Sequence, residues 1–236
     1  MTSRKHMRVA GLLGGLAIGF ATMAIPARAE ARPIVVELFT SQGCSSCPPA
    51  DALLGELARR GDVLALGFHI DYWDDLGWKD PLSSRSATDR QRGYARHFNG
   101  GQVYTPQMVI EGSEELVGSD RGGVLGALRA AKPATAAPVA FAADRRTVAV
   151  GGGTAAGDVV LVRYALRRTT HIGAGENASR TLDDANGVTA LTKLGAWSGA
   201  PLQFAIDPPA AGEGVAVLVQ AEDGHMLGAA AITDDK

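Results

Sequence analysis

Cys44 and Cys47 are the only two cysteines in the 236-residue sequence, and they form a Cys-x-x-Cys motif. They follow an apolar, β-branched run at 34–39, and Pro48 directly after them is typical of the first turn of a helix. A thiol at the start of a helix lies among unpaired backbone N–H groups, which favour the thiolate that attacks disulfides. The motif therefore predicts thiol–disulfide exchange, with Cys44 as the nucleophile and Cys47 as the resolving thiol.

Two other interpretations of the cysteine pair remain open. A structural disulfide would close a loop of about four residues and would stabilise the fold by less than about 2 kcal/mol. A zinc site would need two more ligands, but copper(I) accepts two thiolates, and His69 is a candidate third ligand. The competing functions are therefore a copper-binding metallochaperone and a non-enzymatic interaction module. Exchange itself requires no dissociable cofactor, because the redox-active group would be the Cys44–Cys47 disulfide.

Three further residues are candidates for the same site. Thr105 and Pro106 precede an apolar run at 108–110, and a cis-proline there would face the thiols and align the backbone of a substrate beside Thr105. A trans-proline that simply begins a strand is the alternative. Glu37 lies on the run that leads to Cys44 and is a candidate buried proton acceptor for the resolving thiol, or else a solvated glutamate at a sheet edge.

The expected elements place these residues on an α/β framework, because strands alternate with helices in the first part of the chain. Segment 133–138 is rich in Pro and Ala and is typical of a linker. Six strand-like runs with Gly, Asp and Asn turns then predict a small antiparallel, sandwich-like β domain over 139–236. The runs lie at 139–141, 147–150, 159–166, 188–197, 215–221 and 226–232. The elements expected before the linker are strands at 34–39, 63–70 and 103–110 and helices after Pro48, at 84–98 and at 121–131.

Residues 1–29 have the pattern of a secretory signal peptide: a basic start, an uncharged stretch at 9–25, and small residues at Ala27 and Ala29. An uncleaved membrane anchor is the alternative, but the stretch is shorter than the roughly 20 residues that span a bilayer. Cleavage would leave no membrane-spanning stretch. We therefore expect an exported protein, periplasmic or secreted, in a compartment where disulfides persist.

The composition is that of an ordinary globular protein. Hydrophobic residues make up 46% of the chain and charged residues 20%, which excludes a disordered chain. The net charge is −2 and becomes −6 without residues 1–29, which contain four basic and no acidic residues. Such a chain presents no basic surface for nucleic acid. The expected partners are protein or small-molecule thiols and disulfides, including a redox partner that recycles the pair.

The sequence resembles the thioredoxin superfamily and, more narrowly, a secreted thioredoxin-like family labelled domain of unknown function 1223. The resemblance spans nearly all of the chain after residue 29 and implies no known substrate. It implies a thioredoxin-like domain over 30–132, the linker 133–138 and a β-rich extension over 139–236. The segments that carry it are 36–51, 68–81, Arg90-Gln91 with Tyr94-Ala95, 104–108 and 175–186.

The chain also departs from ordinary thioredoxins. Gly43 precedes the cysteines and 45–46 are two serines, so the Trp-Cys-Gly-Pro-Cys active site is absent and a redox potential cannot be transferred. An insertion at 69–81 carries aromatic and acidic residues and is expected to overhang the thiols as a lid or substrate surface. Tyr72 and Trp73 are its candidate substrate contacts, and a cap on the sheet is the other interpretation of its aromatic residues.

Two polar groups have open interpretations. His69 and Asp71 are placed to tune a thiolate or to bind metal, or His69 is a buried, hydrogen-bonded histidine. Glu176, Asn177 and Arg180 form either an interdomain polar lock, part of a surface site, or an ordinary turn network.

Overall fold

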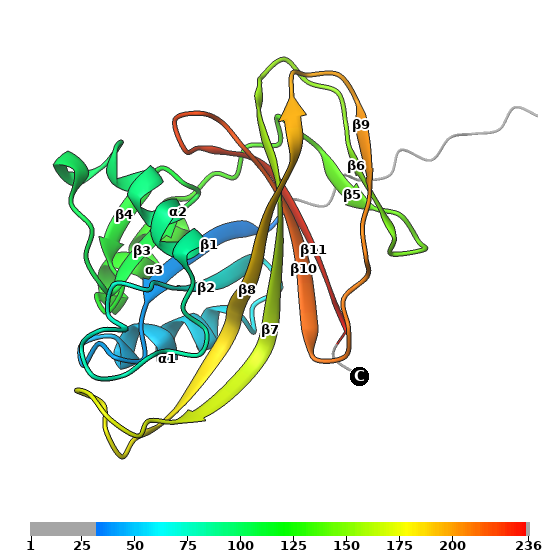
Figure 1. The fold of residues 1–236 in the computed structure, drawn as a ribbon. Helices are drawn as coiled ribbons and strands as arrows, with labels where there is room; N and C mark the ends of the chain where they lie inside the picture. The colour runs from blue at the N-terminus through cyan, green and yellow to red at the C-terminus, as the bar shows by residue number, and fades with distance from the viewer. Residues whose placement is uncertain (1–31, 235–236) are drawn as a thin grey trace, which may run out of the picture. The chain divides into compact units, whose positions relative to one another are not determined.

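The computed structural model describes residues 32–234, so the predicted signal peptide at 1–29 lies outside the described residues (Figure 1). None of the helices in this range is long and apolar enough to cross a membrane. The first half contains β1 (Ile34–Thr40), α1 (Pro48–Leu57), β2 (Val63–His69), α2 (Arg85–Ala95), η1 (Asn99–Gly101), β3 (Gln107–Ile110), β4 (Glu114–Val117) and α3 (Arg121–Ala130). The second half contains β5 (Val139–Phe141), β6 (Thr147–Val150), β7 (Gly157–His171), β8 (Thr181–Trp197), β9 (Leu202–Ala205), β10 (Glu213–Gln220) and β11 (Met226–Asp234).

Eight strands form one sheet in the order β11-β10-β7-β8-β2-β1-β3-β4. β1 and β2 are parallel, whereas β3 runs antiparallel to β1 and β4 antiparallel to β3. The two halves of the sheet meet where Gly67 of β2 pairs with Gly187 of β8. Strands from both sides of 133–138 therefore share a sheet, while β5, β6 and β9 form a second sheet of three strands. The fold is a mixed α/β fold with a large sheet and few helices, as the sequence predicts at this level.

The alternating side chains of β1 serve two cores. Val36 and Leu38 pack against α1 and α3 on one face of the sheet. Val35 and Phe39 face α2 and the strands β7, β8 and β10 on the other. α1 begins with Pro48 at its first turn and buries a leucine stripe at helical spacing against the sheet. This packing fixes the end of β1 relative to the start of α1, and the segment between them contains the cysteines.

β7 and β8 are longer than the sequence predicts. The expected strand at 159–166 extends to His171, and the expected strand at 188–197 begins at Thr181. The added residues form a two-stranded ribbon with exposed charges such as Arg167, so they lack the apolar pattern that marks a strand. β4 was not predicted either, because this short outer strand of the sheet has no fully buried residue and carries two glutamates.

Candidate functional site

Cys44 and Cys47 form a disulfide where β1 gives way to α1. Their Cα atoms are 5.4 Å apart, and Cys47 is the N-cap residue of α1. The Sγ of Cys44 lies 3.3 Å from the Oγ of Ser46. Both cysteines are 0% exposed, although Ser45 and Ser46 between them are exposed. The predicted strand, turn, cysteine pair and helix therefore all occur in order, but the sulfur atoms are covered.

Asp51 is the carboxyl that shares α1 with the disulfide. Its N–H donates to the carbonyl of Cys47, so the two residues are one helical turn apart and share a helix face. The Thr40 hydroxyl donates to its Oδ1 at 2.7 Å. Burial raises the pKa of Asp51 to about 7, although the charge of His69 and the bond from Thr40 act in the opposite direction. Asp51 was not among the predicted site residues, although its four-residue spacing from Cys47 in the sequence was an available signal.

His69 lies at the centre of a buried group of carboxyls. Its Nδ1 is 2.7 Å from Oδ2 of Asp80, and its Nε2 is 3.9 Å from Oδ1 of Asp184. Burial by itself would lower the pKa of His69, but the charges of Asp80, Asp184 and Asp51 outweigh it and raise the pKa to about 9. The interpretation of His69 as a buried, hydrogen-bonded histidine agrees with these contacts. In the part of the chain that the structure describes, no group of three or more His, Cys, Asp or Glu is arranged to hold a metal ion.

The raised pKa of His69 gives stability a pH dependence with a definite sign. Between pH 6.5 and about 9 the folded protein binds more protons than the unfolded chain at this residue. The contribution of His69 to the free energy of unfolding should therefore be fully present below pH 6.5 and fall by about 3 kcal/mol as the pH rises through this window. Urea unfolding at several pH values measures the slope. His69→Asn keeps a donor near Asp80 but cannot titrate, so an unchanged slope in this variant would refute the assignment.

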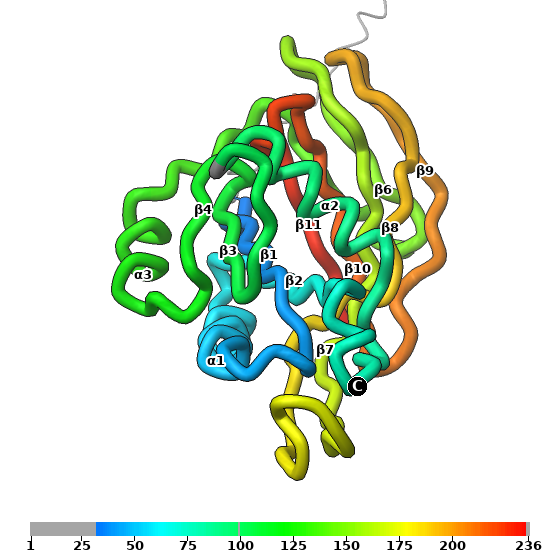
Figure 2. The backbone as a smooth tube through the Cα atoms, turned by 60° about the vertical axis from the view of Figure 1, so that its left-hand side comes forward, coloured from blue at the N-terminus to red at the C-terminus, as the bar shows by residue number. Residues whose placement is uncertain are grey.

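The connection between β7 and β8, residues 172–180 (the hairpin tip), lies against the cysteine segment. Figure 2 shows it at the end of the fold where the chain enters α1. Asn177 is 1% exposed, and its side-chain amide donates to the carbonyls of Gln42 and Cys44, at 2.9 Å each. Glu176 accepts a hydrogen bond from the Ser45 N–H at 3.0 Å. These two residues therefore connect the second half of the chain to the cysteines, rather than forming only a local turn network.

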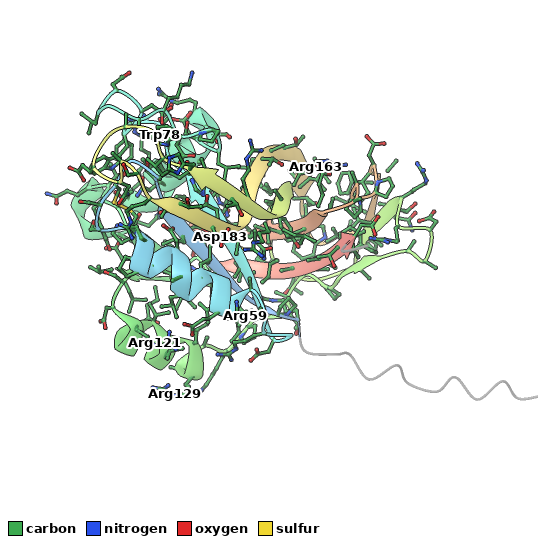
Figure 3. All side chains as sticks on the ribbon, turned by 90° about the horizontal axis from the view of Figure 1, so that it is seen from below. Arg59, Trp78, Arg121, Arg129, Arg163 and Asp183 are labelled. Carbon is green, nitrogen blue, oxygen red and sulfur yellow. A yellow bond between two sulfur atoms is a disulfide. The ribbon has the colours of Figure 1, made fainter. Side chains whose placement is uncertain are left out.

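Gln42 joins the insertion, the cysteine segment and β8. Its Nε2 donates to Asp184 at 2.7 Å, and its Oε1 accepts from the Trp78 indole at 3.2 Å. Its backbone N–H donates to Asp80 at 2.8 Å. In Figure 3, Trp78 lies beside the hairpin tip, and a methyl group on Gly175 would be 3.1 Å from its Cβ. The surroundings of the cysteine segment are thus formed by parts of the chain that are distant in sequence.

The other aromatic candidates in the insertion take different positions. Trp73 packs next to Gly43, where an added methyl group would lie 3.7 Å from the Trp73 Cβ. The Tyr72 hydroxyl donates to Gln91 of α2 at 3.1 Å. Both side chains are partly buried against the core on the α2 side. Trp73 therefore borders the cysteine segment, whereas the hydroxyl of Tyr72 is directed to α2.

Thr105 and Pro106 precede β3, and the peptide bond between them is cis. A methyl group on Gly118 would lie 3.3 Å from the Cβ of Pro106 and 3.1 Å from that of Ala50. Pro106 is therefore close to the first turns of α1, which follow Cys47. The hydroxyl of Thr105 is the one buried side-chain oxygen or nitrogen within 32–234 that has no hydrogen-bond partner.

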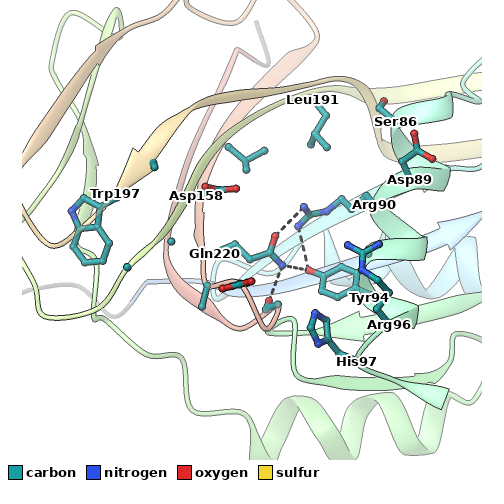
Figure 4. Close-up of a pocket in the computed structure, with 18 of the residues that line it drawn as sticks. Ser86, Asp89, Arg90, Tyr94, Arg96, His97, Asp158, Leu191, Trp197 and Gln220 are labelled. Atoms are coloured by element: carbon teal, nitrogen blue, oxygen red, sulfur yellow. Dashed lines mark hydrogen bonds between the residues drawn. The ribbon is translucent and has the colours of Figure 1, made fainter. Parts of the chain in front are cut away.

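Glu37 lies in a different environment from the one that was predicted for it. Its carboxylate forms an ion pair with Arg90 through bonds of 2.6 and 3.0 Å and accepts a bond from the Tyr94 hydroxyl. Gln220 bonds to both Arg90 and Tyr94, at the edge of a cleft of about 950 Å³ (Figure 4). Glu37 is thus buried as expected, but its contacts are with α2 and not with the cysteines.

The fold and site together define an α/β protein with a disulfide between a strand and the helix that follows it. A family model described as protein of unknown function (DUF1223) matches residues 35–220. The chain belongs to this family, which confirms the narrower resemblance, to domain of unknown function 1223. No curated protein matches the sequence.

Two solved structures are similar to this chain. Protein AGR_C_4864 from Agrobacterium tumefaciens is 33% identical with a TM-score of 0.72, and the match covers 88% of this chain and 96% of that one. HBP35 of Porphyromonas gingivalis is 13% identical with a TM-score of 0.53, over 87% of this chain and 76% of that one. At this low identity, the second match concerns the fold alone.

Proposed function

We propose that this chain is an exported, thioredoxin-like thiol–disulfide oxidoreductase that exchanges the Cys44–Cys47 disulfide with thiols of protein or small-molecule partners. One observation carries the proposal: the disulfide stands at the start of α1, and a half-buried acidic residue, Asp51, lies one turn further along the same helix. A helix N-terminus stabilises a thiolate, and a carboxyl with a pKa of about 7 exchanges protons near neutral pH.

The exchange is balanced with a dithiol as the reducing partner. A partner thiolate attacks Sγ of Cys44, a mixed disulfide forms, and Cys47 leaves as a thiolate. The second thiolate of the partner then attacks the partner sulfur that is bonded to Cys44. The partner becomes a disulfide, and Cys44 leaves as a thiolate. Two electrons and two protons pass to the cysteine pair. The reverse sequence reduces a partner disulfide, and a separate dithiol or disulfide partner must then restore the starting state.

Two further residues have roles in this proposal: Asp51 transfers a proton, and Thr105 binds the backbone of the partner. Asp51 would protonate the Cys47 thiolate as it leaves, or accept its proton in the reverse direction. The unpartnered hydroxyl of Thr105 would bond to the backbone of a partner aligned by Pro106. Trp73, which borders Gly43, would form one wall of the partner site.

A turnover assay tests the function. Insulin supplies protein disulfides and dithiothreitol supplies electrons, and the protein should accelerate insulin reduction at substoichiometric concentration. The double variant Cys44→Ser/Cys47→Ser is the matched control. If the wild type and the double variant give the same rate with insulin and also with oxidised glutathione, the proposal is wrong.

Asp51→Asn should change the pH dependence of exchange. In the wild type, the rate at which the reduced pair resolves a mixed disulfide should rise with pH and inflect near 7, where Asp51 loses its proton. The variant should lose this inflection and resolve the mixed disulfide about 100-fold more slowly at pH 8, as expected for removal of a general base. Acid quenching followed by mass spectrometry measures the mixed disulfide. Asp184→Asn removes a nearby carboxyl that does not share α1 with Cys47, and it should keep the inflection.

A further inference from the structure

The cysteine pair has an arrangement that the exchange function does not explain. Reactive thiols are generally accessible to the partner that they attack, yet Cys44 and Cys47 are both 0% exposed. The exposed residues of this segment, Ser45 and Ser46, have no thiol. A partner sulfur therefore cannot reach Sγ of Cys44 unless some covering element moves.

The hairpin tip forms hydrogen bonds to the backbone on both sides of Cys44 and on Cys44 itself. The Asn177 amide donates to the carbonyls of residues 42 and 44, on either side of Gly43. Its Oδ1 accepts a bond from Arg180 at 2.8 Å, which orients the amide group. Because both acceptors are backbone atoms of the cysteine segment, Asn177 fastens the tip to that segment.

The rest of the tip has its own internal structure. Ile172, which is fully buried, exchanges backbone hydrogen bonds with Ser179 and Arg180. Ser179 has a positive φ of 67°, and Gly175 has a φ of 75°. The bonds within the tip are therefore separate from those that fasten it to the cysteine segment.

We infer that the hairpin tip is a movable cover over the disulfide and that Asn177 is the positioning residue that keeps it closed. Exchange then requires the tip to open, and a partner gains access to Cys44 only in the open state. This inference rests on the proposed exchange function and adds to it an element from the second half of the chain.

The test measures the rate at which tris(2-carboxyethyl)phosphine reduces the disulfide of the folded protein. The phosphine supplies two electrons and becomes its oxide with an oxygen from water, and the released thiols are counted by alkylation. Asn177→Ala should be reduced about 5- to 100-fold faster than the wild type, because two buried hydrogen bonds are lost. Glu176→Gln, which changes an exposed contact of the same tip, should stay within about threefold of the wild type.

Asn177→Asp separates hydrogen bonding from side-chain volume. The ionised carboxylate has the same shape but no donor, so its reduction should be as fast as that of Asn177→Ala. When the pH falls below about 4, the introduced carboxyl takes a proton and regains one donor. The ratio of the variant's reduction rate to that of the wild type should then decrease. A purely steric role of Asn177 would leave this ratio unchanged with pH. Such a constant ratio would overturn the role assigned to the amide.

The wild type provides a measurement that does not depend on the variants folding. Its reduction should be at least tenfold slower than that of the urea-unfolded chain. At low urea concentrations, the logarithm of the rate should rise with a slope well below the one for global unfolding, because local opening exposes less surface.

Two results would overturn the inference, and they differ in what they say of the exchange function. Reduction of the native protein as fast as the unfolded chain, with no effect of Asn177, would mean that the site is open, and exchange would stand. If reduction proceeds only with the full urea slope of global unfolding, the disulfide is structural. Both the exchange function and the movable cover would then be rejected.

Discussion

Replacing Cys44 with serine should lower the rate of disulfide exchange by at least about a thousandfold, because the attacking sulfur is lost. Replacing Cys47 with serine should have a different effect: Cys44 still attacks, but the mixed disulfide is not resolved. With oxidised glutathione, the Cys47→Ser protein should therefore accumulate as a mixed disulfide of Cys44 with one glutathione, and the other glutathione leaves as a thiolate. Intact-mass measurement after acid quenching detects the adduct directly.

The fold should survive both substitutions. A loop of about four residues contributes less than about 2 kcal/mol through its disulfide, so the variants can be compared at equal folded concentration. Circular dichroism and urea unfolding provide this control. An adduct that forms equally on Cys44→Ser would mean that Cys47 is the exposed nucleophile, and the assigned roles would be reversed.

Arg90→Ala should destabilise the protein by about 3 to 5 kcal/mol, because it leaves the buried carboxylate of Glu37 without its partner. The side chains of Arg90 and Glu37 are only 8% and 1% exposed. The guanidinium also stacks over the rings of Phe68 and Tyr94, with centroid distances of 5.4 and 5.3 Å. The midpoint of urea unfolding measures the loss.

A double substitution separates the ion pair from the packing around it. Glu37→Met with Arg90→Met removes both charges and keeps similar volume, so it should recover most of the stability that Arg90→Ala loses. It should also leave the exchange rate of the Cys44–Cys47 pair unchanged, because the contacts of Glu37 are with α2. A large loss of exchange in a folded double variant would restore Glu37 as the proton acceptor and contradict the assignment of Asp51.

The sequence predicts much of the first half of the fold because its elements are buried and local. The apolar run that becomes β1, the helix after Pro48 and the second strand are each recognised within a few residues. The disulfide between Cys44 and Cys47 is one of the outcomes that their spacing predicts. These features depend on neighbouring residues, so a single sequence is sufficient to find them.

The parts of the site that sequence reasoning missed depend on long-range contacts. Asp184 lies 142 residues from Gln42 in sequence, and no local pattern indicates that they meet. Asn177 is a candidate for an interdomain polar lock in the sequence, but no local pattern indicates its contact with Gln42, which is 135 residues away. Glu37 was expected beside the thiols because it precedes them on a strand. The pleat of β1 instead directs it to the face of Val35 and Phe39, opposite α1.

The reduction potential of the Cys44–Cys47 pair is the most direct test of the exchange function. The protein is equilibrated in glutathione buffers of defined ratio, and the reduced fraction is read by thiol labelling. We expect a potential between about −120 and −270 mV, the range of proteins that exchange disulfides. A potential below about −300 mV, with no exchange with insulin or glutathione, would identify a structural disulfide and contradict the proposed exchange function.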